Sequence, residues 1–213
     1  MKTKKQDLVE IEFTANIKDG VVFDTTNKET AVKEGLTGEQ VNKQFKPLKV
    51  FIGRGQVIKG FDNALEDKEI GKEYTIEISE KEGYGKRDPK LVRTIPSNAF
   101  EQPPQRGMFV NLNGMIARVI SVTGGRVLVD MNNPLAGKDL VYKFKILKII
   151  NDDKEKLSAL AESFMIKPEI KEDSEKKELK ISIESKVPEP IKKKFETDCK
   201  ELIKTKVILE VKK

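Results

Sequence analysis

Residues 47–65 read PLKVFIGRGQVIKGFDNAL, and this stretch decides the expected fold of the first part of the chain. Its first six residues are mostly apolar and predict a strand, which the turn Gly53-Arg54-Gly55 ends. After the turn, Ile58, Phe61 and Leu65 recur at steps of three and four residues, the period of a short amphipathic helix. The third glycine of a dinucleotide-binding loop does not follow at the required spacing, so we interpret the glycines as a tight turn.

Strands are predicted on both sides of this unit, at residues 8–13, 21–23, 74–78 and 140–147. Asp19-Gly20 is typical of a hairpin turn and joins the first two of them. Residues 24–46 are polar and predict a long loop with one helical turn at most. Gly71 is expected to end the helix that begins near Val57.

A second region follows, and it has a different composition. Residues 86–134 carry seven Lys or Arg against three acidic residues, with three of the five Met of the chain. Asn113-Gly114 and Gly124-Gly125 favour tight hairpins between strands. We therefore predict a β-meander with strands at residues 108–112, 115–122 and 126–131.

The last 60 residues predict a small α+β domain. Asp152 or Asp153 caps a helix that runs to Phe164, and Pro188 and Pro190 open another. The apolar stripe of this second helix holds Ile191, Phe195, Cys199 and Leu202, and strands are predicted at residues 179–183 and 206–211. The expected core is thin, so this domain either pairs two chains as a homodimer or docks on the first domain.

Composition excludes several classes of enzyme. The chain has no His and a single Cys, which excludes Ser-His and Cys-His nucleophilic sites, His-ligated metals and Cys-rich zinc sites. We expect no cofactor and no metal. Cys199 is interpreted as a packing residue, because nothing near it in the sequence would lower its pKa.

Charge and hydropathy give expectations about location and partners. Charged residues make up 36% of the chain, and the formal net charge is +6. No apolar run approaches the 18 or so residues of a membrane span, and polar Gln6-Asp7 follow the basic start, so we expect a cytoplasmic protein. Since Lys alternates with Glu and aromatic residues are few, the charge favours solvated faces, and nucleic-acid binding is only a third hypothesis.

The motifs in their order resemble one family. Residues 19–24 (Asp-Gly-x-x-Phe-Asp), residues 47–65 and Gly83-Tyr84-Gly85 together resemble the FKBP-type peptidyl-prolyl cis-trans isomerases. Residues 129–140 look like the return segment of SlyD-like members, which carry a small chaperone domain inserted in the flap. The region after residue 151 resembles long archaeal members in its architecture.

This resemblance implies an α+β fold with an FKBP-like antiparallel sheet wrapped on a short helix, an inserted small β domain and a C-terminal α+β domain. The isomerase domain would be discontinuous and comprise residues 1–86 and 132–151. The inserted chaperone domain would span residues 87–131, and the C-terminal domain residues 152–213.

The resemblance also implies an apolar catalytic pocket: Phe13, Phe23, Asp24, Leu48, Val57, Ile58, Phe61, Tyr84 and Tyr142. The Ile58 backbone N–H and the Tyr84 hydroxyl would anchor substrate carbonyls, and Asp24 would set the polarity. Rotation about an X–Pro bond requires no proton transfer and no nucleophile, which agrees with a chain that has no His. The implied partners are unfolded or proline-containing polypeptides.

The inserted domain would bind unfolded chains through Phe100, Met108, Phe109, Met115 and Met131, since Met adapts to varied apolar partners. Departures from the family pattern occur at Leu48, Phe61, Gly83 and Tyr142. The first three motivate an alternative function, a holdase chaperone with a weak or vestigial isomerase pocket. The metal-binding tail of SlyD has no counterpart here, so nickel delivery is not implied.

Overall fold

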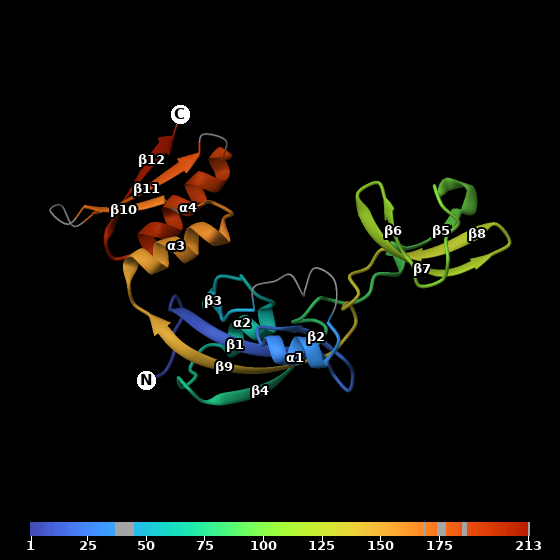
Figure 1. Cartoon of the computed structure of the whole chain (residues 1–213), viewed down its shortest axis with the longest axis horizontal. Coiled ribbons are helices and arrows are strands. Elements are labelled where there is room, and N and C mark those ends of the chain that lie inside the picture. The colour runs from blue at the N-terminus through green and yellow to red at the C-terminus, as the bar shows by residue number, and fades with distance from the viewer. Residues whose placement is uncertain (37–44, 168, 174–177, 185–186, 213) are drawn as a thin grey trace. The chain divides into compact units, whose positions relative to one another are not determined.

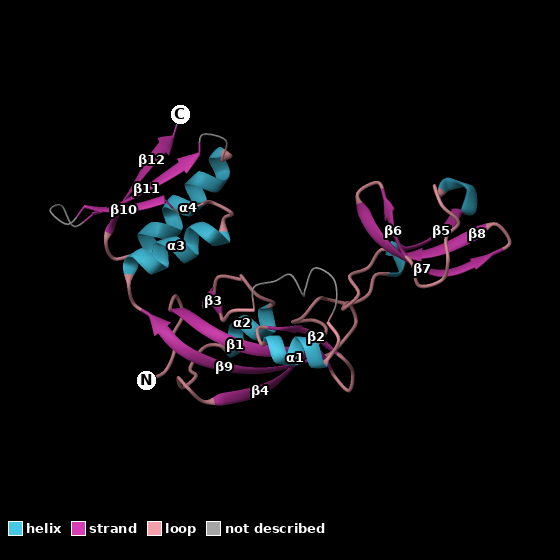
Figure 2. Ribbon diagram, viewed as in Figure 1, coloured by secondary structure: helices cyan, strands magenta, loops and turns pink. Residues whose placement is uncertain are grey.

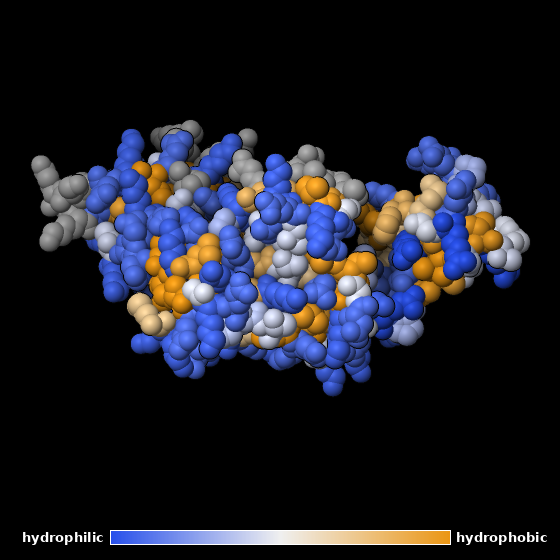
Figure 3. All heavy atoms as spheres, turned by 60° about the horizontal axis from the view of Figure 1, so that its bottom comes forward, coloured by the Kyte–Doolittle hydropathy of each residue, from blue (hydrophilic) through white to orange (hydrophobic). Residues whose placement is uncertain are grey.

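The computed structural model describes residues 1–36, 45–167, 169–173, 178–184 and 187–212. The chain divides into two compact units, residues 1–78 together with 141–213, and residues 79–140. Figure 1 traces both along the sequence and Figure 2 shows that each combines strands with short helices. Hydrophilic side chains cover most of the face in Figure 3, with apolar patches between them. No helix in the described part of the chain is long and apolar enough to cross a membrane.

The first unit begins with a five-stranded sheet. Its strands are β1 (Leu8–Ile17), β2 (Val22–Thr25), β3 (Leu48–Phe51), β4 (Glu73–Ile78) and β9 (Leu140–Ile150). The order is β2-β1-β9-β4, and β3 pairs with β1 in antiparallel register. The short helix α2 (Lys59–Ala64) places buried Phe61 against aromatic rings of β1 and β9. The expected antiparallel sheet wrapped on a short helix is confirmed.

Two local predictions in this sheet are wrong. Residues 24–46 hold more than one helical turn, because α1 (Lys28–Lys33) has six residues and Asn27 caps it by accepting the Thr30 N–H. The predicted loop also covers residues 37–44, which lie outside the described residues. Gly71 does not end α2, which stops at Ala64. Instead, the Gly71 N–H donates to the Ile146 carbonyl at 2.8 Å, in the turn before β4.

The second unit contains a four-stranded antiparallel sheet. Two short 3-10 helices, η2 (Pro89–Leu91) and η3 (Ser97–Ala99), flank β5 (Val92–Pro96), and β6 (Phe109–Leu112), β7 (Met115–Thr123) and β8 (Arg126–Asp130) complete it. The order is β5-β8-β7-β6. The core consists of Ala117, Val119, Val127 and Val129. The meander is as predicted, but the sequence analysis missed β5, whose neighbouring prolines are typical of loops.

The C-terminal part contributes two helices and three strands, α3 (Asp153–Ser163), β10 (Glu169–Asp173), β11 (Glu178–Glu184), α4 (Glu189–Leu202) and β12 (Lys206–Lys212). β11 pairs with β10 in antiparallel and with β12 in parallel register. Asp152 caps α3 by accepting the Glu155 N–H at 2.7 Å. Leu8 and Phe51 of the first sheet lie in the same apolar cluster as the core of this part, so the two share one core within the first unit.

Candidate functional site

Aromatic side chains from four elements meet in the first unit. The ring of Phe13, on β1, lies 5.6 Å from that of Phe61 on α2 and 5.8 Å from that of Tyr142 on β9. Phe61 and Tyr142 are 4.6 Å apart, and Phe23 on β2 lies 6.2 Å from Tyr142. Four of the predicted pocket residues therefore form one cluster, although they are far apart in the sequence.

Hydrogen bonds from the neighbouring strand fix Phe13. Its N–H donates to the Thr26 hydroxyl oxygen at 2.9 Å, and the Thr25 hydroxyl donates to its carbonyl at 3.0 Å. Asp24 precedes these threonines and lies opposite Ala15 in the register of β1 and β2. The backbone of Phe13 is thus held in place on β1, next to the strand that carries Asp24.

The turn before α2 is organised by a buried carboxylate that the sequence analysis missed. Asp62 is only 6% exposed, and its two oxygens accept the N–H groups of Gly53 and Gly55, each at 2.8 Å. Both glycines have positive φ angles of 80° and 65°, which other residues adopt only with strain. Gln56 adds an acceptor for the Phe51 N–H at 2.7 Å. The turn that carries Val57 and Ile58 is therefore fixed.

Ile58 occupies the position just before α2. Its carbonyl accepts the N–H groups of Phe61 and Asp62 at 3.0 Å, so its orientation is set by the first turn of the helix. Its own N–H has no hydrogen-bond partner among the residues that the structure describes. Because an unpaired backbone N–H seeks an acceptor, this group can donate to the carbonyl of a bound peptide.

A cavity of about 930 Å³ lies beside this cluster. Its walls come from β1, β2, the residues around β3, and α3: Glu10, Phe13, Asp24, Thr25, Thr26, Phe45, Lys46, Pro47, Leu48, Lys49, Val50, Gln56, Ala159, Glu162 and Ser163. Three predicted pocket residues, Phe13, Asp24 and Leu48, are among them. The sequence analysis missed Phe45, because it precedes the recognisable motif, and the three α3 residues, because they lie a hundred positions further along.

The other predicted pocket residues do not line this cavity. Phe61 and Tyr142 are 1% and 5% exposed and contact Phe13 from within the core. Val57, Ile58 and Phe23 are half-buried and are likewise not among the residues of its wall. Phe13 therefore lies between the cavity and the aromatic cluster: it lines the cavity and contacts Phe61 and Tyr142.

Tyr84 belongs to the second unit, where its side chain is 37% exposed. The neighbouring Gly83 departs from the family pattern, and the space around its backbone gives a reason for this. A Cβ at this position would lie 3.3 Å from both the Leu140 side chain and the Ser79 carbonyl. Space around the backbone therefore favours glycine here.

Comparison with known proteins agrees with this geometry. The profile described as FKBP-type peptidyl-prolyl cis-trans isomerase matches residues 1–101, and that of the FKBP26 IF domain matches residues 95–135. A short-type peptidyl-prolyl cis-trans isomerase of Methanocaldococcus jannaschii is 34% identical over 146 residues, covering 67% of this chain and 91% of the relative. The chain belongs to the FKBP-type peptidyl-prolyl cis-trans isomerase family.

Relatives with the name SlyD extend the similarity. The SlyD protein of Yersinia pestis is 28% identical over 163 residues, covering 74% of this chain and 75% of its own. The SlyD protein of Escherichia coli K12 is 26% identical over 164 residues, with 74% and 76% covered. The two matched profiles together run from residue 1 to residue 135, so the resemblance seen in the sequence motifs is confirmed.

The second unit, residues 79–140, is inserted in the sequence between the two parts of the first unit and is called the inserted unit below. It exposes part of its apolar surface. Met108, Phe109 and Met115 are 38%, 61% and 52% exposed, whereas Phe100 and Met131 pack against the small core. The sequence analysis missed Ile116, which is 69% exposed. In the β6–β7 register Phe109 pairs with Arg118 and Asn111 with Ile116, which puts Phe109 and Ile116 on one face and Met115 on the other.

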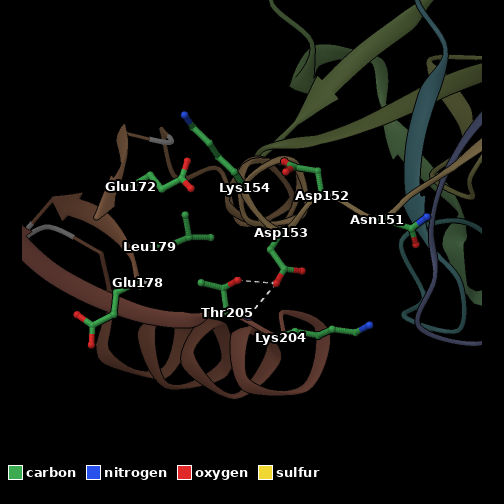
Figure 4. Close-up of a pocket in the computed structure, with 9 residues that line it drawn as sticks. All are labelled: Asn151, Asp152, Asp153, Lys154, Glu172, Glu178, Leu179, Lys204 and Thr205. Carbon is green, nitrogen blue, oxygen red and sulfur yellow. Dashed lines mark hydrogen bonds between the residues drawn. The ribbon is translucent and has the colours of Figure 1, made fainter. Parts of the chain in front are cut away.

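The polar residues that line a second cavity, of about 480 Å³, include a pair that holds two elements together. Figure 4 shows its polar lining, with Asp153 pointing toward Thr205. One carboxylate oxygen of Asp153 accepts both the Thr205 N–H at 2.7 Å and its hydroxyl at 2.8 Å, which ties α3 to the start of β12. Within the described residues no group of three or more His, Cys, Asp or Glu could hold a metal ion.

Cys199, the only cysteine, is buried on α4. Burial, together with nearby Asp198 and Glu196, raises the pKa of the thiol to about 12. A thiol with such a pKa stays protonated near neutral pH and is a poor nucleophile. The sequence-based interpretation of Cys199 as a packing residue therefore agrees with its environment.

Proposed function

We propose that this protein accelerates the cis-trans isomerisation of X–Pro bonds in polypeptides, in the cavity that Phe13, Asp24 and Leu48 line. The observation that carries the proposal is the position of Phe13, which borders the cavity and also contacts the Phe61 and Tyr142 rings. The Phe13 ring, backed by this cluster, gives the cavity an apolar surface that excludes water from a prolyl ring packed against it. The name of the Methanocaldococcus relative supports the same activity.

The mechanism follows from the electronic structure of the amide. Its partial double bond gives rotation a barrier of ~18–20 kcal/mol. Water stabilises the polarised planar amide more than the twisted, less polar transition state, so transfer to a drier site favours rotation. The reaction needs no proton transfer, and Phe13 and Leu48 supply the apolar surroundings.

The remaining groups orient the substrate. The Ile58 N–H, which has no partner among the described residues, donates to a substrate carbonyl. The Asp24 carboxylate lines the cavity and sets its polarity near the carbonyl carbon of the rotating bond. The role expected for the Tyr84 hydroxyl, a second contact to a substrate carbonyl, stays a prediction.

We also propose that the inserted unit holds unfolded chains for this reaction, in the cytoplasm. Exposed Phe109 and Ile116, which share one sheet face, support that role. The alternative is a holdase without catalysis. It is favoured by one observation, that Val57, Phe61 and Tyr142 do not line the cavity.

A protease-coupled assay with Xaa-Pro tetrapeptides separates the two. We expect the full-length protein to accelerate the cis-to-trans step, and Asp24→Ala to reduce kcat/KM roughly tenfold or more. Suppression of aggregation of a reduced, unfolded client is measured in parallel. Peptide isomerisation at the uncatalysed rate, with aggregation still suppressed, would leave only the holdase function.

A further inference from the structure

The C-terminal part of the chain supplies one wall of the cavity in the first unit. Ala159, Glu162 and Ser163, all on or at the end of α3, line it together with Phe13 and Asp24. These α3 residues lie in the predicted C-terminal domain, after the residues that carry the isomerase motifs. The cavity is therefore completed by a segment that an isomerase domain alone would not have.

Ion pairs and apolar packing fix α3 at this place. Lys49 Nζ lies 2.8 Å from a Glu155 carboxylate oxygen, and this hydrogen bond lowers the pKa of Glu155. Arg54 is only 23% exposed and bridges Asp198 at 3.2 Å and Glu201 at 2.5 Å, both on α4, whose Phe195 packs against Phe164 at the end of α3. Leu8 and Phe51 of the first sheet pack in the same cluster as Leu157 and Leu160 of α3. Such contacts hold the α3 wall in a defined position.

The sign of the charge around the cavity differs from the sign of the net charge of the chain. Among the described residues of its wall, three carry carboxylates (Glu10, Asp24 and Glu162) and two carry ammonium groups (Lys46 and Lys49), so this part of the wall is net negative in a chain of formal charge +6. Lys148 neutralises Glu10 at 3.1 Å, and Glu155 neutralises Lys49.

Glu162 differs from these paired groups. Its carboxylate accepts one hydrogen bond, from the Ser158 hydroxyl at 3.4 Å, and it has no ion pair within the described part of the chain. A carboxylate that stands on the wall of a substrate cavity, with no ion pair to any described residue, is available to a cationic side chain of the substrate.

We propose that Glu162 is a specificity-determining residue, which makes the isomerase prefer polypeptides with Lys or Arg next to the proline. This inference rests on the proposed isomerase function. A peptide whose prolyl ring lies against Phe13 must place its neighbouring side chains along the rest of the cavity wall, and the α3 part of that wall presents Glu162. A substrate with Glu at the same position meets repulsion instead.

The test compares tetrapeptides that carry Lys, Leu or Glu before proline. For the wild-type chain we expect kcat/KM for Lys to exceed that for Glu roughly threefold to fivefold at low salt, and this ratio to shrink at high ionic strength. Glu162→Gln should bring the ratio close to one, and Glu162→Lys should reverse it. Glu196→Lys, on the exposed surface of α4, changes the net charge equally and should leave the ratio as in the wild type.

The outcomes distinguish this inference from the function on which it rests. Isomerisation of all three peptides with equal kcat/KM, or identical ratios for Glu162→Lys and Glu196→Lys, would overturn the role of Glu162 and leave the isomerase intact. No acceleration of any peptide would overturn both. Leucine peptides serve as the internal reference, since their rates should change little among the variants.

Discussion

The ring of Phe61 lies 4.6 Å from the ring of Tyr142, tilted by 37°, and both side chains are almost fully buried. This pair connects α2 to β9 and supports Phe13 from inside, so that Phe13 can form the cavity wall. Phe61 also packs edge-on against Phe144 at 5.3 Å. Most of the aromatic residues predicted to line a substrate pocket thus lie in the core beneath the cavity and support its wall.

Replacing Phe61 tests this supporting role. Phe61→Ala should lower the free energy of unfolding by about 3–5 kcal/mol, because it removes a buried ring and leaves a cavity among Phe13, Tyr142 and Phe144. Phe61→Leu should cost less, since most of the volume is retained. Urea unfolding followed by circular dichroism measures both. A loss below about 1 kcal/mol for the alanine variant would contradict the burial of this ring.

Asp62 should be required for the turn that carries Ile58. Asp62→Ala leaves the N–H groups of Gly53 and Gly55 without their acceptor, and we expect a loss of stability of about 1–3 kcal/mol. Because Ile58 then loses its fixed position, kcat/KM should fall even under conditions where the variant is fully folded. The fall should therefore exceed what a smaller fraction of folded protein would cause. Glu66→Ala is the control, since the one ion pair of Glu66 within the described residues is a long one, of 3.9 Å, with Lys5. Equal kinetics for the two variants would argue against a positioning role.

The exposed face of the inserted unit can be tested without disturbing the core. The double variant Phe109→Ser, Ile116→Ser should reduce suppression of client aggregation severalfold, because it removes exposed apolar contact area. Tetrapeptide isomerisation should not change. Val32→Ser is a matched control on the first unit, as Val32 is also 69% exposed. Chaperone activity that survives the double variant would place client binding elsewhere.

Acid should weaken the second unit through Asp130. Burial acts to raise the pKa of this carboxyl, but hydrogen bonds from Asn132 and Arg87 outweigh it and hold the pKa below its ordinary value of 3.8. Since the folded pKa is depressed, this stabilisation is present above the unfolded pKa and is lost as the pH falls through the folded one. Calorimetric melting at pH 7 and near pH 3 should therefore show a larger loss for the wild type than for Asp130→Asn. Glu101→Gln, at an exposed position, should behave as the wild type.

The Cys199 thiol should resist modification in the folded protein. With its pKa raised to about 12 by burial and by Asp198 and Glu196, the thiolate is scarce at pH 8, and the side chain is covered. Reaction with a disulfide reagent should be slow until the protein is unfolded in urea. Rapid labelling of the native chain would show that α4 separates readily from its neighbours.

Local sequence patterns were sufficient to predict an element where its conformation depends on residues within one turn of the chain. Asn113-Gly114 predicted the β6–β7 hairpin because both residues adopt positive φ angles, 52° and 87°, and Asp152 predicted the start of α3 because an N-cap bonds within one turn. β10 was missed because its residues, Glu-Ile-Lys-Glu-Asp, are mostly charged. Its strand conformation depends on pairing with β11, which lies further along the chain.

The sequence by itself determined most of the strands and helices, the absence of histidine chemistry and the residues that mark an FKBP-type isomerase, because these follow from composition and short-range spacing. Only the tertiary structure decided which of those residues reach the cavity and which lie beneath it, that Asp62 holds the turn, and that Glu162 joins the wall. Each depends on contacts between segments far apart in the chain, and side-chain burial is set by what the fold packs against a residue rather than by its neighbours in sequence.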